Sequence, residues 1–207
     1  MEMVVCVVDD DEEVRQCLDH LLRSVGLTVR LFSCAHEFLA SGDVGPIGCL
    51  ILDVRMPWMS GLMLQDELIA RKVDVPIIFL TGHADLPMVV NTMKKGACDF
   101  FLKPFNNQAL LDAVQQAVDR ARKTQTRKTQ SAEIAARHAN LTTKEREILR
   151  HIRSSRPAKV IAHEMGLSRK TIDTHLAAIR RKMHAESTGE LMLMLQNHLP
   201  DPIARSA

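Results

Sequence analysis

The sequence is poor in aromatic residues and contains no tyrosine: one tryptophan and six phenylalanines make up 3% of its 207 residues. Surfaces that stack single-stranded bases need several aromatic side chains, so the composition argues against them. No apolar stretch approaches the ~20 residues of a membrane-spanning helix. The first apolar run, residues 3–8, is too short for a signal peptide and ends in acids. We therefore expect a cytoplasmic protein with no membrane partner.

The sequence also lacks a cysteine framework. Its five cysteines are odd in number, show no Cys-x-x-Cys spacing and all lie in the first half of the chain: Cys6, Cys17, Cys34, Cys49 and Cys98. Disulfide scaffolds and zinc sites use even sets or paired spacings. We interpret these residues as reduced thiols and expect neither a disulfide framework nor a zinc site.

The net charge of +2 conceals an asymmetry along the chain. Residues 1–119 carry 9 Lys/Arg and 17 Asp/Glu, a net of −8, whereas residues 120–207 carry 18 and 8, a net of +10. This division indicates an acidic domain joined to a basic domain that meets a polyanion.

Apolar strands alternate with amphipathic helices over the first part of the chain. The expected strands are 3–8, 27–32, 49–53, 75–80 and 98–102, and the expected helices lie near 12–25, 35–40, 60–69, 85–95 and 107–122. This order predicts an α/β fold with five βα repeats, a doubly wound parallel sheet with helices on both faces. The apolar run that ends at Asp53 is typical of a central strand buried on both faces.

Polar residues follow the predicted strands at their carboxyl ends, which meet at one edge of a parallel sheet. They are Asp9, Asp10, Asp53, Thr81 and Lys103. Three neighbouring carboxylates repel one another unless a cation lies among them, and hard oxygen ligands select Mg²⁺ or Mn²⁺. Once its charge is shielded, Asp53 can attack a phosphoryl group whose oxygens contact Lys103 and Thr81.

These five residues, the order of the elements and the Lys103-Pro104 pair closely resemble the receiver domain of two-component response regulators. The resemblance implies that Asp53 accepts phosphate from a sensor histidine kinase. It also implies a metal site in which Asp10 is a direct ligand, beside Asp53 itself. Asp9 would bind the metal directly or through water, and the backbone carbonyl of Arg55 would complete the protein ligands.

The resemblance further assigns the reading of the phosphoryl group to Thr81 and Lys103. Phe100 matches an aromatic residue that swings inward in relatives, although simple core packing is its other interpretation. The changed surface would comprise the fourth helix, the fifth strand and the fifth helix, through which relatives dimerise. Trp58 departs from the pattern, because relatives often carry glycine there. We interpret it as a ring that closes over the site, a partner contact or a passive surface residue.

Residues 120–140 are polar and nearly repeat themselves, with Arg-Lys-Thr-Gln at 122–125 and again at 127–130. They show no apolar periodicity. We predict a linker at 123–139 between a first domain at 1–122 and a second at 140–200. The linker is either a solvated extension of the fifth helix or a coil.

From Leu141 onward the pattern is helical, and helix starts are marked by Thr142 or Thr143, Pro157 and Ser168. The helix from 168 to 183 places apolar residues on one face: Ile172, Leu176, Ile179 and Met183. A basic helix after a short helix and a turn with glycine indicates a helix-turn-helix. Segments 141–149 and 168–176 resemble the LuxR-type output domain, so nearly the whole chain resembles the NarL/FixJ family of response regulators.

The exposed face of this basic helix predicts DNA contacts. In relatives the positions of Asp173, Thr174 and Ala177 face the bases. Asp173 would accept from a cytosine amino group or orient an arginine, and the Ala177 methyl could touch thymine. Phosphate contacts set affinity rather than sequence choice, and we expect them from Lys159, Arg169, Lys170, Thr171, His175, Arg180 and Lys182. His175 has a second interpretation, as a residue packed within the helix-turn-helix.

These features predict a transcription factor rather than an enzyme, switched by phosphorylation of Asp53, which dimerises and binds a two-fold double-stranded promoter site. RNA polymerase would be a further partner. One alternative is an aspartyl-phosphate phosphatase, which Arg55 disfavours because those enzymes carry an acid at its position. The other is DNA binding independent of phosphorylation, which the intact set of strand-end residues disfavours.

Overall fold

The structure is a computed structural model that describes residues 2–42, 44–82, 85–154 and 157–198. The chain divides into two compact units, Met1–Gln125 and Thr126–Ala207, which we call the N-terminal unit and the C-terminal unit. None of the helices in these ranges is long and apolar enough to span a membrane.

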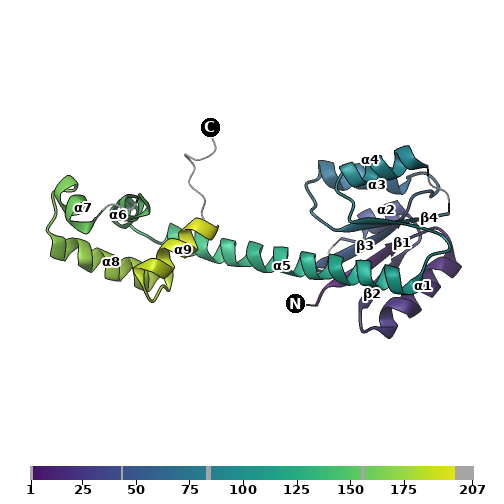
Figure 1. Cartoon of the computed structure of the whole chain (residues 1–207), viewed down its shortest axis with the longest axis horizontal. Helices are drawn as coiled ribbons and strands as arrows, with labels where there is room; N and C mark the ends of the chain where they lie inside the picture. The colour runs from purple at the N-terminus through teal and green to yellow at the C-terminus, as the bar shows by residue number, and fades with distance from the viewer. Residues whose placement is uncertain (1, 43, 83–84, 155–156, 199–207) are drawn as a thin grey trace. The chain divides into compact units, whose positions relative to one another are not determined.

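The N-terminal unit is built on a parallel sheet with strand order β2-β1-β3-β4-β5. Helices α1 and α5 cover one face, and α2, α3 and α4 cover the other (Figure 1). This arrangement confirms the predicted α/β class. The elements in chain order are β1 (Val4–Val8), α1 (Glu12–Ser24), β2 (Thr28–Phe32), α2 (Ala35–Ala40), β3 (Ile47–Asp53), α3 (Gly61–Ala70), β4 (Ile77–Thr81), α4 (Leu86–Lys94), β5 (Asp99–Leu102) and α5 (Asn107–Ala139).

Strand β3 lies at the centre of the sheet and is buried from Gly48 to Asp53. Its side chains alternate between two cores, because successive residues of a strand point to opposite faces. Leu50 and Leu52 enter the core beneath α2–α4, whereas Cys49 and Ile51 enter the core beneath α1 and α5. Each such Leu or Ile side chain contributes ~1.5–3 kcal/mol by its burial, so the strand that ends in Asp53 is firmly held.

Side-chain caps fix where the helices that follow the strands begin. The carboxylate of Asp11 accepts hydrogen bonds from the backbone amides of Glu13 and Val14 at the start of α1. Ser60 and Asp85 cap α3 and α4 in the same way. Each cap satisfies helix N–H groups that have no partner within the helix. The chain therefore turns from each strand into its helix close to the edge where the strands end.

Helix α3 differs in one respect from the expected pattern. The apolar residues Leu62, Leu64, Leu68 and Ile69 predict its buried side. Leu64 and Leu68 are buried, but Ile69 is 49% exposed and Gln65 is buried instead. The Gln65 side-chain amide donates to the backbone carbonyl of Thr92 in α4 at 3.3 Å. The α3–α4 contact therefore favours a polar residue at a position where hydrophobic patterning alone predicts an apolar one.

Helix α5 runs for 33 residues, through the whole of the predicted linker at 123–139. Of the two conformations left open by the sequence, this stretch is therefore helical. Its C-terminal part belongs to the C-terminal unit, where Ile134 joins the core and the Ser131 hydroxyl lies 3.0 Å from the His198 ring.

The C-terminal unit contains α6 (Thr143–Arg153), α7 (Ala158–Glu164), α8 (Arg169–Met183) and α9 (Thr188–His198). The helical pattern predicted from 141 onward is therefore confirmed. Thr142 caps α6 with a reciprocal capping box to Glu145, and Ser168 caps α8. The predicted end of the second domain at residue 200 lies outside the described residues. The core of the unit comprises Ile134, Leu141, Ile148, Leu149, Ile161, Ala162, Ile172, Ile179, Met183, Leu191 and Leu195.

Candidate functional site

Four of the predicted site residues lie at one edge of the sheet in the N-terminal unit. Asp9 follows β1, Asp53 ends β3, Thr81 ends β4 and Lys103 follows β5. Register places Asp53 opposite Leu80 and Thr81 opposite Leu102. Asp9, Asp53 and Thr81 are 2%, 5% and 1% exposed, so the sheet holds two carboxylates almost out of water. Neighbouring parallel strands thus bring together residues far apart in the sequence.

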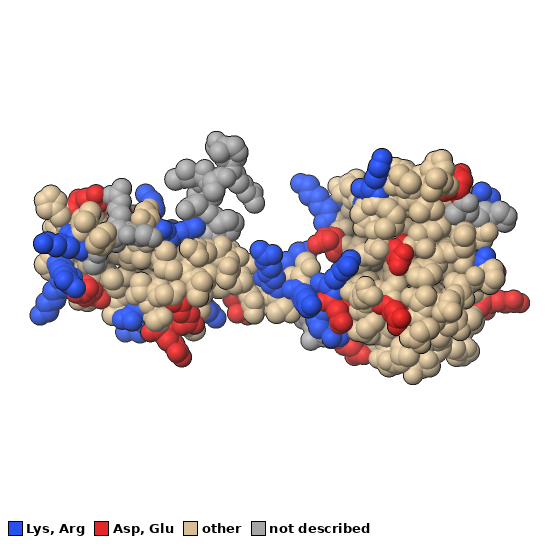
Figure 2. All heavy atoms as spheres, in the orientation of Figure 1, with Lys and Arg blue, Asp and Glu red and all other residues tan. Residues whose placement is uncertain are grey.

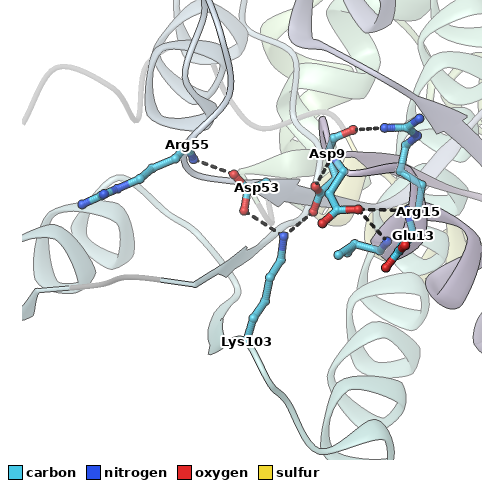
Figure 3. Close-up of polar contacts among 8 residues, drawn as sticks. Asp9, Glu13, Arg15, Asp53, Arg55 and Lys103 are labelled. Atoms are coloured by element: carbon cyan, nitrogen blue, oxygen red, sulfur yellow. Dashed lines mark hydrogen bonds and ion pairs between the residues drawn. The ribbon is translucent and has the colours of Figure 1, made fainter.

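Lys103 lies between the two buried carboxylates (Figure 3). Its Nζ atom is 2.6 Å from Asp9 Oδ2 and 3.1 Å from Asp53 Oδ1. Lys103 itself is held by its backbone amide, which donates to the Thr81 carbonyl at 2.8 Å. One ammonium group therefore contacts two carboxylates, and the strands fix all three groups.

The remaining carboxylate oxygens accept backbone amides. Asp53 Oδ2 accepts from the Arg55 amide at 2.6 Å, and Asp9 Oδ1 accepts from the Asp11 amide at 3.0 Å. The Arg15 guanidinium donates to the Asp9 carbonyl at 2.7 Å. The side chain of Arg55 points away from the site in Figure 3, so only its backbone serves Asp53. These bonds fix the rotation of both carboxylates.

Burial raises the pKa of Asp53 above its ordinary value, although Lys103 opposes this shift. Burial also acts to lower the pKa of Lys103, but the Asp9 and Asp53 carboxylates outweigh it and raise that pKa. A lysine that stays protonated therefore does not fully compensate the buried charge of Asp53. The site remains short of positive charge.

The donor set fits a small hard cation. Asp9, Asp10 and Asp53 offer carboxylate oxygens, and Arg55 offers a backbone carbonyl. Of the three carboxylates, that of Asp10 is exposed, because Asp10 lies between β1 and α1. Mg²⁺ takes one or two carboxylates and keeps several waters, so it needs no closed protein cage. Within the described ranges, no three His, Cys, Asp or Glu side chains are already gathered as a metal cage. The uncompensated charge of Asp53 supplies the electrostatic reason for a cation here.

Gly61 is a residue of the site that sequence reasoning identified only as a helix start. Its amide donates to the Val54 carbonyl at 3.0 Å, which closes the loop that leaves Asp53. A Cβ atom at this position would lie 2.1 Å from the Asp53 carbonyl oxygen and 2.9 Å from Leu52 Cγ. Only glycine allows this approach of two backbones. The Ser60-Gly61 pair was the available signal, but it reveals no contact distance.

Phe100 is partly buried on β5, and its ring centroid lies 6.2 Å from that of Phe79. The ring therefore packs against the core beneath α2–α4. Its movement on phosphorylation stays a prediction.

The C-terminal unit presents α7, a turn at Gly166 and the basic helix α8. Figure 2 shows Lys and Arg side chains gathered over the end of the unit where α7 and α8 meet. Of the predicted DNA contacts, six are exposed: Lys159, Arg169, Lys170, Asp173, Thr174 and Ala177. Thr171, His175, Arg180 and Lys182 are partly buried. The Thr171 amide donates to the Ser168 cap, and the Thr174 hydroxyl donates to the Lys170 carbonyl.

Two of the predicted phosphate contacts, Lys182 and Arg180, are partly enclosed by the C-terminal unit itself. Lys182 Nζ lies 2.7 Å from Glu145 Oε2, so it links α8 to the buried capping residue of α6. The Nε atom of Arg180 is buried and has no hydrogen-bond partner among the described residues. The exposed residues at the start of α8 are therefore the more accessible of the predicted phosphate contacts.

The fold and the strand-end site define the N-terminal unit as a receiver domain. Residues 5–115 match the family described as response regulator receiver domain, and residues 139–195 match the luxR family of bacterial regulatory proteins. The chain therefore belongs to the two-component response regulators, in the NarL/FixJ family that joins a receiver to a LuxR-type helix-turn-helix domain.

Relatives share this organisation over nearly their whole length. The chain is 40% identical over 191 residues to Nodulation protein W of Bradyrhizobium diazoefficiens, covering 92% of this chain and 84% of that protein. It is 41% identical over 193 residues to the response regulator TmoT of Ectopseudomonas mendocina, covering 92% and 87%. FixJ of Azorhizobium caulinodans is 39% identical over 190 residues, with coverages of 92% and 90%.

Solved structures give the same assignment. The response regulator StyR matches with a TM-score of 0.83 at 39% identity, covering 95% of this chain and 99% of that chain. Full-length FixJ from B. japonicum matches with a TM-score of 0.58 at 34% identity, covering 96% and 98%.

Proposed function

We propose that this chain is a phosphorylation-switched transcriptional regulator of the cytoplasm. Asp53 accepts a phosphoryl group from a sensor histidine kinase, and the phosphorylated chain dimerises and binds promoter DNA. The observation that carries the proposal is the setting of Asp53. It is a buried carboxylate at the end of the central strand, bonded to Lys103 and to the Arg55 amide, with its charge incompletely compensated.

In the proposed reaction, a carboxylate oxygen of Asp53 attacks the phosphorus of a phosphohistidine. A P–O bond forms as the P–N bond breaks, and the imidazole leaves with the electron pair. Bound Mg²⁺ supplies charge neutralisation to the phosphoryl oxygens and to the carboxylates. Lys103 gives the same oxygens a fixed positive charge, and the Thr81 hydroxyl donates to one of them. The Arg55 amide orients the attacking carboxylate.

An apolar stripe on α4 supports the proposed dimerisation. Leu86, Val90 and Met93 recur at helical spacing and are 76%, 42% and 42% exposed. Leu102 on the edge strand β5 adds a fourth apolar side chain at 54% exposure. Exposed apolar groups gathered in this way are typical of protein interfaces. A second copy of the receiver, presenting the same surface, is the partner that we propose for it.

The exposed cations at the start of α8 support DNA binding by the C-terminal unit. Arg169 and Lys170 stand at the helix N-terminus, where phosphates are favoured by both the side chains and the helix amides. Asp173, Thr174 and Ala177 follow on the exposed side and are proposed to face bases. RNA polymerase is a proposed partner of the DNA-bound dimer.

The test of the proposal is to map the phosphorylated residue. The chain is treated with phosphoramidate and Mg²⁺ and then with borohydride, which reduces an acyl phosphate to an alcohol. Peptide mass spectrometry should find homoserine at position 53 in the wild type, and removal of Mg²⁺ by a chelator should abolish it. Modification of Asp53→Asn at another carboxylate to the wild-type extent would contradict the proposal.

A further inference from the structure

Trp58 is the only tryptophan of the chain, and it lies in the loop that leaves the phosphoacceptor Asp53. Trp58 is 87% exposed, which is the highest value among the large exposed apolar residues that the structure describes. A bare indole ring in water carries a large unburied apolar surface, and such rings are enriched where proteins meet partners.

The backbone of Trp58 is in an unusual conformation. Its φ angle is +63°, in the left-handed region that favours glycine and is uncommon for a bulky residue. The Met59 amide donates to the Pro57 carbonyl at 2.7 Å, so Trp58 is the central residue of a three-residue turn. Strained conformations of this kind cluster at functional sites.

The neighbours of Trp58 hold this turn in place. Met56 is buried and Met59 is partly buried, and both pack into the core beneath α2–α4. The ring therefore projects from a loop that is anchored on either side of it. A side chain held out in this way loses little conformational freedom when a partner covers it, which favours its use as a binding anchor.

The loop also keeps Trp58 close to Asp53. The Gly61 amide closes the loop on the Val54 carbonyl, and Gly61 packs directly on the Asp53 backbone. Trp58 is three residues from Gly61, so their Cα atoms are no more than about 11 Å apart. Asp53 is only 5% exposed, and a macromolecule that brings a phosphoryl group to its carboxylate must come down over this edge. A small phosphodonor needs no such contact.

We infer that Trp58 is an anchor for the protein phosphodonor: its ring inserts into an apolar recess beside the phosphohistidine of the kinase. Met63, 54% exposed on the first turn of α3, adds apolar surface after the same loop. This inference rests on the proposed function, because it assumes that a protein delivers the phosphoryl group to Asp53. It adds a residue that determines which donor is used and takes no part in the transfer itself.

The test compares two donors on the same full-length variants. One donor is phosphoramidate. The other is the autophosphorylated cytoplasmic part of the histidine kinase that, within a panel, transfers fastest to the wild-type chain. Trp58→Asn removes the ring but keeps a residue that tolerates positive φ. Trp58→Phe keeps an aromatic ring. Leu193→Asn removes an apolar side chain that is 60% exposed in the C-terminal unit, and serves as the matched control.

We expect Trp58→Asn to lower the rate constant of transfer from the kinase by about tenfold or more, as for an aromatic interface anchor. Trp58→Phe should recover most of the loss, and Leu193→Asn should have no effect. With phosphoramidate, all variants should react within about twofold of the wild type.

Three outcomes would overturn the inference. Equal transfer from the kinase to Trp58→Asn and wild type would show a passive surface ring. An equal change with both donors would show a ring that covers the site. Loss of self-association by Trp58→Asn, with kinase transfer unchanged, would assign the ring to a second copy of the chain. Failure of the wild type to react with phosphoramidate at Asp53 would instead contradict the proposed function.

Discussion

Each unit of the molecule contains a buried carboxylate bound by a lysine from another element, and the two carboxylates differ in how well they are compensated. In the N-terminal unit, burial raises the pKa of Asp53 despite Lys103. In the C-terminal unit, burial also acts to raise the pKa of Glu145, but Lys182 and Thr142 outweigh it and lower that pKa.

The difference follows from what each group contacts. Glu145 accepts the Lys182 ammonium at 2.7 Å and the Thr142 amide at 2.7 Å, and no other carboxylate of the described residues is among the causes of its pKa shift. Asp53 shares its lysine with Asp9. A carboxylate whose charge is fully compensated stabilises the fold. A carboxylate that is left short of positive charge can bind a cation and react. A carboxylate paired with a lysine ammonium therefore serves structure in one unit and, we propose, chemistry in the other.

The largest expected effect on stability comes from adding a side chain at Gly61, where the backbone lies against that of Asp53. Gly61→Ala should destabilise the N-terminal unit by about 3 kcal/mol or more, because the new methyl group would overlap the Asp53 carbonyl. Hydrogen exchange of the full chain can measure each unit separately. The amides of β3 and β4 should lose protection while those of α8 keep it. Gly189→Ala in α9 meets only ordinary contacts and should cost nothing. Equal protection of β3 in Gly61→Ala and wild type would contradict the close approach.

A second, smaller effect tests the satisfied pair. Lys182→Met should destabilise the C-terminal unit by about 1–3 kcal/mol, because it leaves the buried Glu145 charge without its lysine. Arg181→Met removes a cation from the preceding position of α8, which is exposed, and should change stability little. Denaturant unfolding, followed by amide hydrogen exchange in α6, measures the stability of both variants. Equal stability of the two variants would mean that Lys182 contributes no more than a surface charge.

The two carboxylates should respond to neutralisation with opposite signs. The folded pKa of Asp53 is raised, so its contribution to stability is present at low pH and is lost as pH rises through that pKa. Asp53→Asn should therefore stabilise the metal-free N-terminal unit at neutral pH. The folded pKa of Glu145 is lowered, so its contribution is present above the unfolded pKa and is lost as pH falls through the folded one.

Glu145→Gln should accordingly destabilise the C-terminal unit at neutral pH, and the difference from wild type should vanish in acid. Exchange protection in a chelator, measured across the acid range for both variants, provides the comparison. Shifts of the same sign for Asp53→Asn and Glu145→Gln at neutral pH would refute the contrast between the two carboxylates.

The smallest effect concerns the basic surface of the C-terminal unit. Arg169→Gln and Lys170→Gln should each reduce the slope of log affinity against log salt by about 0.9, the value for one lost phosphate contact. Asp173→Ala should leave that slope unchanged and alter the preference among base pairs, if it faces a base. Titration of a labelled duplex at several salt concentrations gives both quantities. An unchanged slope in Arg169→Gln would place that side chain away from phosphate.

The sequence was sufficient to predict the parallel sheet, because apolar strands alternated with amphipathic helices in five βα repeats. Strand ends in a parallel sheet share an edge, so Asp9, Asp53, Thr81 and Lys103 could be grouped before any coordinates. The helical C-terminal unit followed in the same way from its caps, and of the two candidate threonines Thr142 is the N-cap of α6.

Contacts between elements could not be read from local pattern. The buried side of α3 depends on α4, which accepts a hydrogen bond from Gln65 and leaves Ile69 exposed. The requirement for glycine at position 61 depends on a backbone that returns to Asp53. Lys182 looks like a surface cation in sequence, and only the packing of α8 on α6 shows its bond to Glu145. Each of these depends on residues distant in the chain, which periodicity does not encode.

The central claim is that chemistry at Asp53 controls the DNA surface of the other unit. The most direct measurement is the affinity of the full chain for a promoter duplex before and after phosphorylation with phosphoramidate and Mg²⁺, for wild type and Asp53→Asn. We predict that wild-type affinity rises by a factor of about 5–150, the usual range of coupling between two sites, and that Asp53→Asn does not respond. Equal affinity of phosphorylated and unphosphorylated wild type, or an equal rise in Asp53→Asn, would contradict the claim.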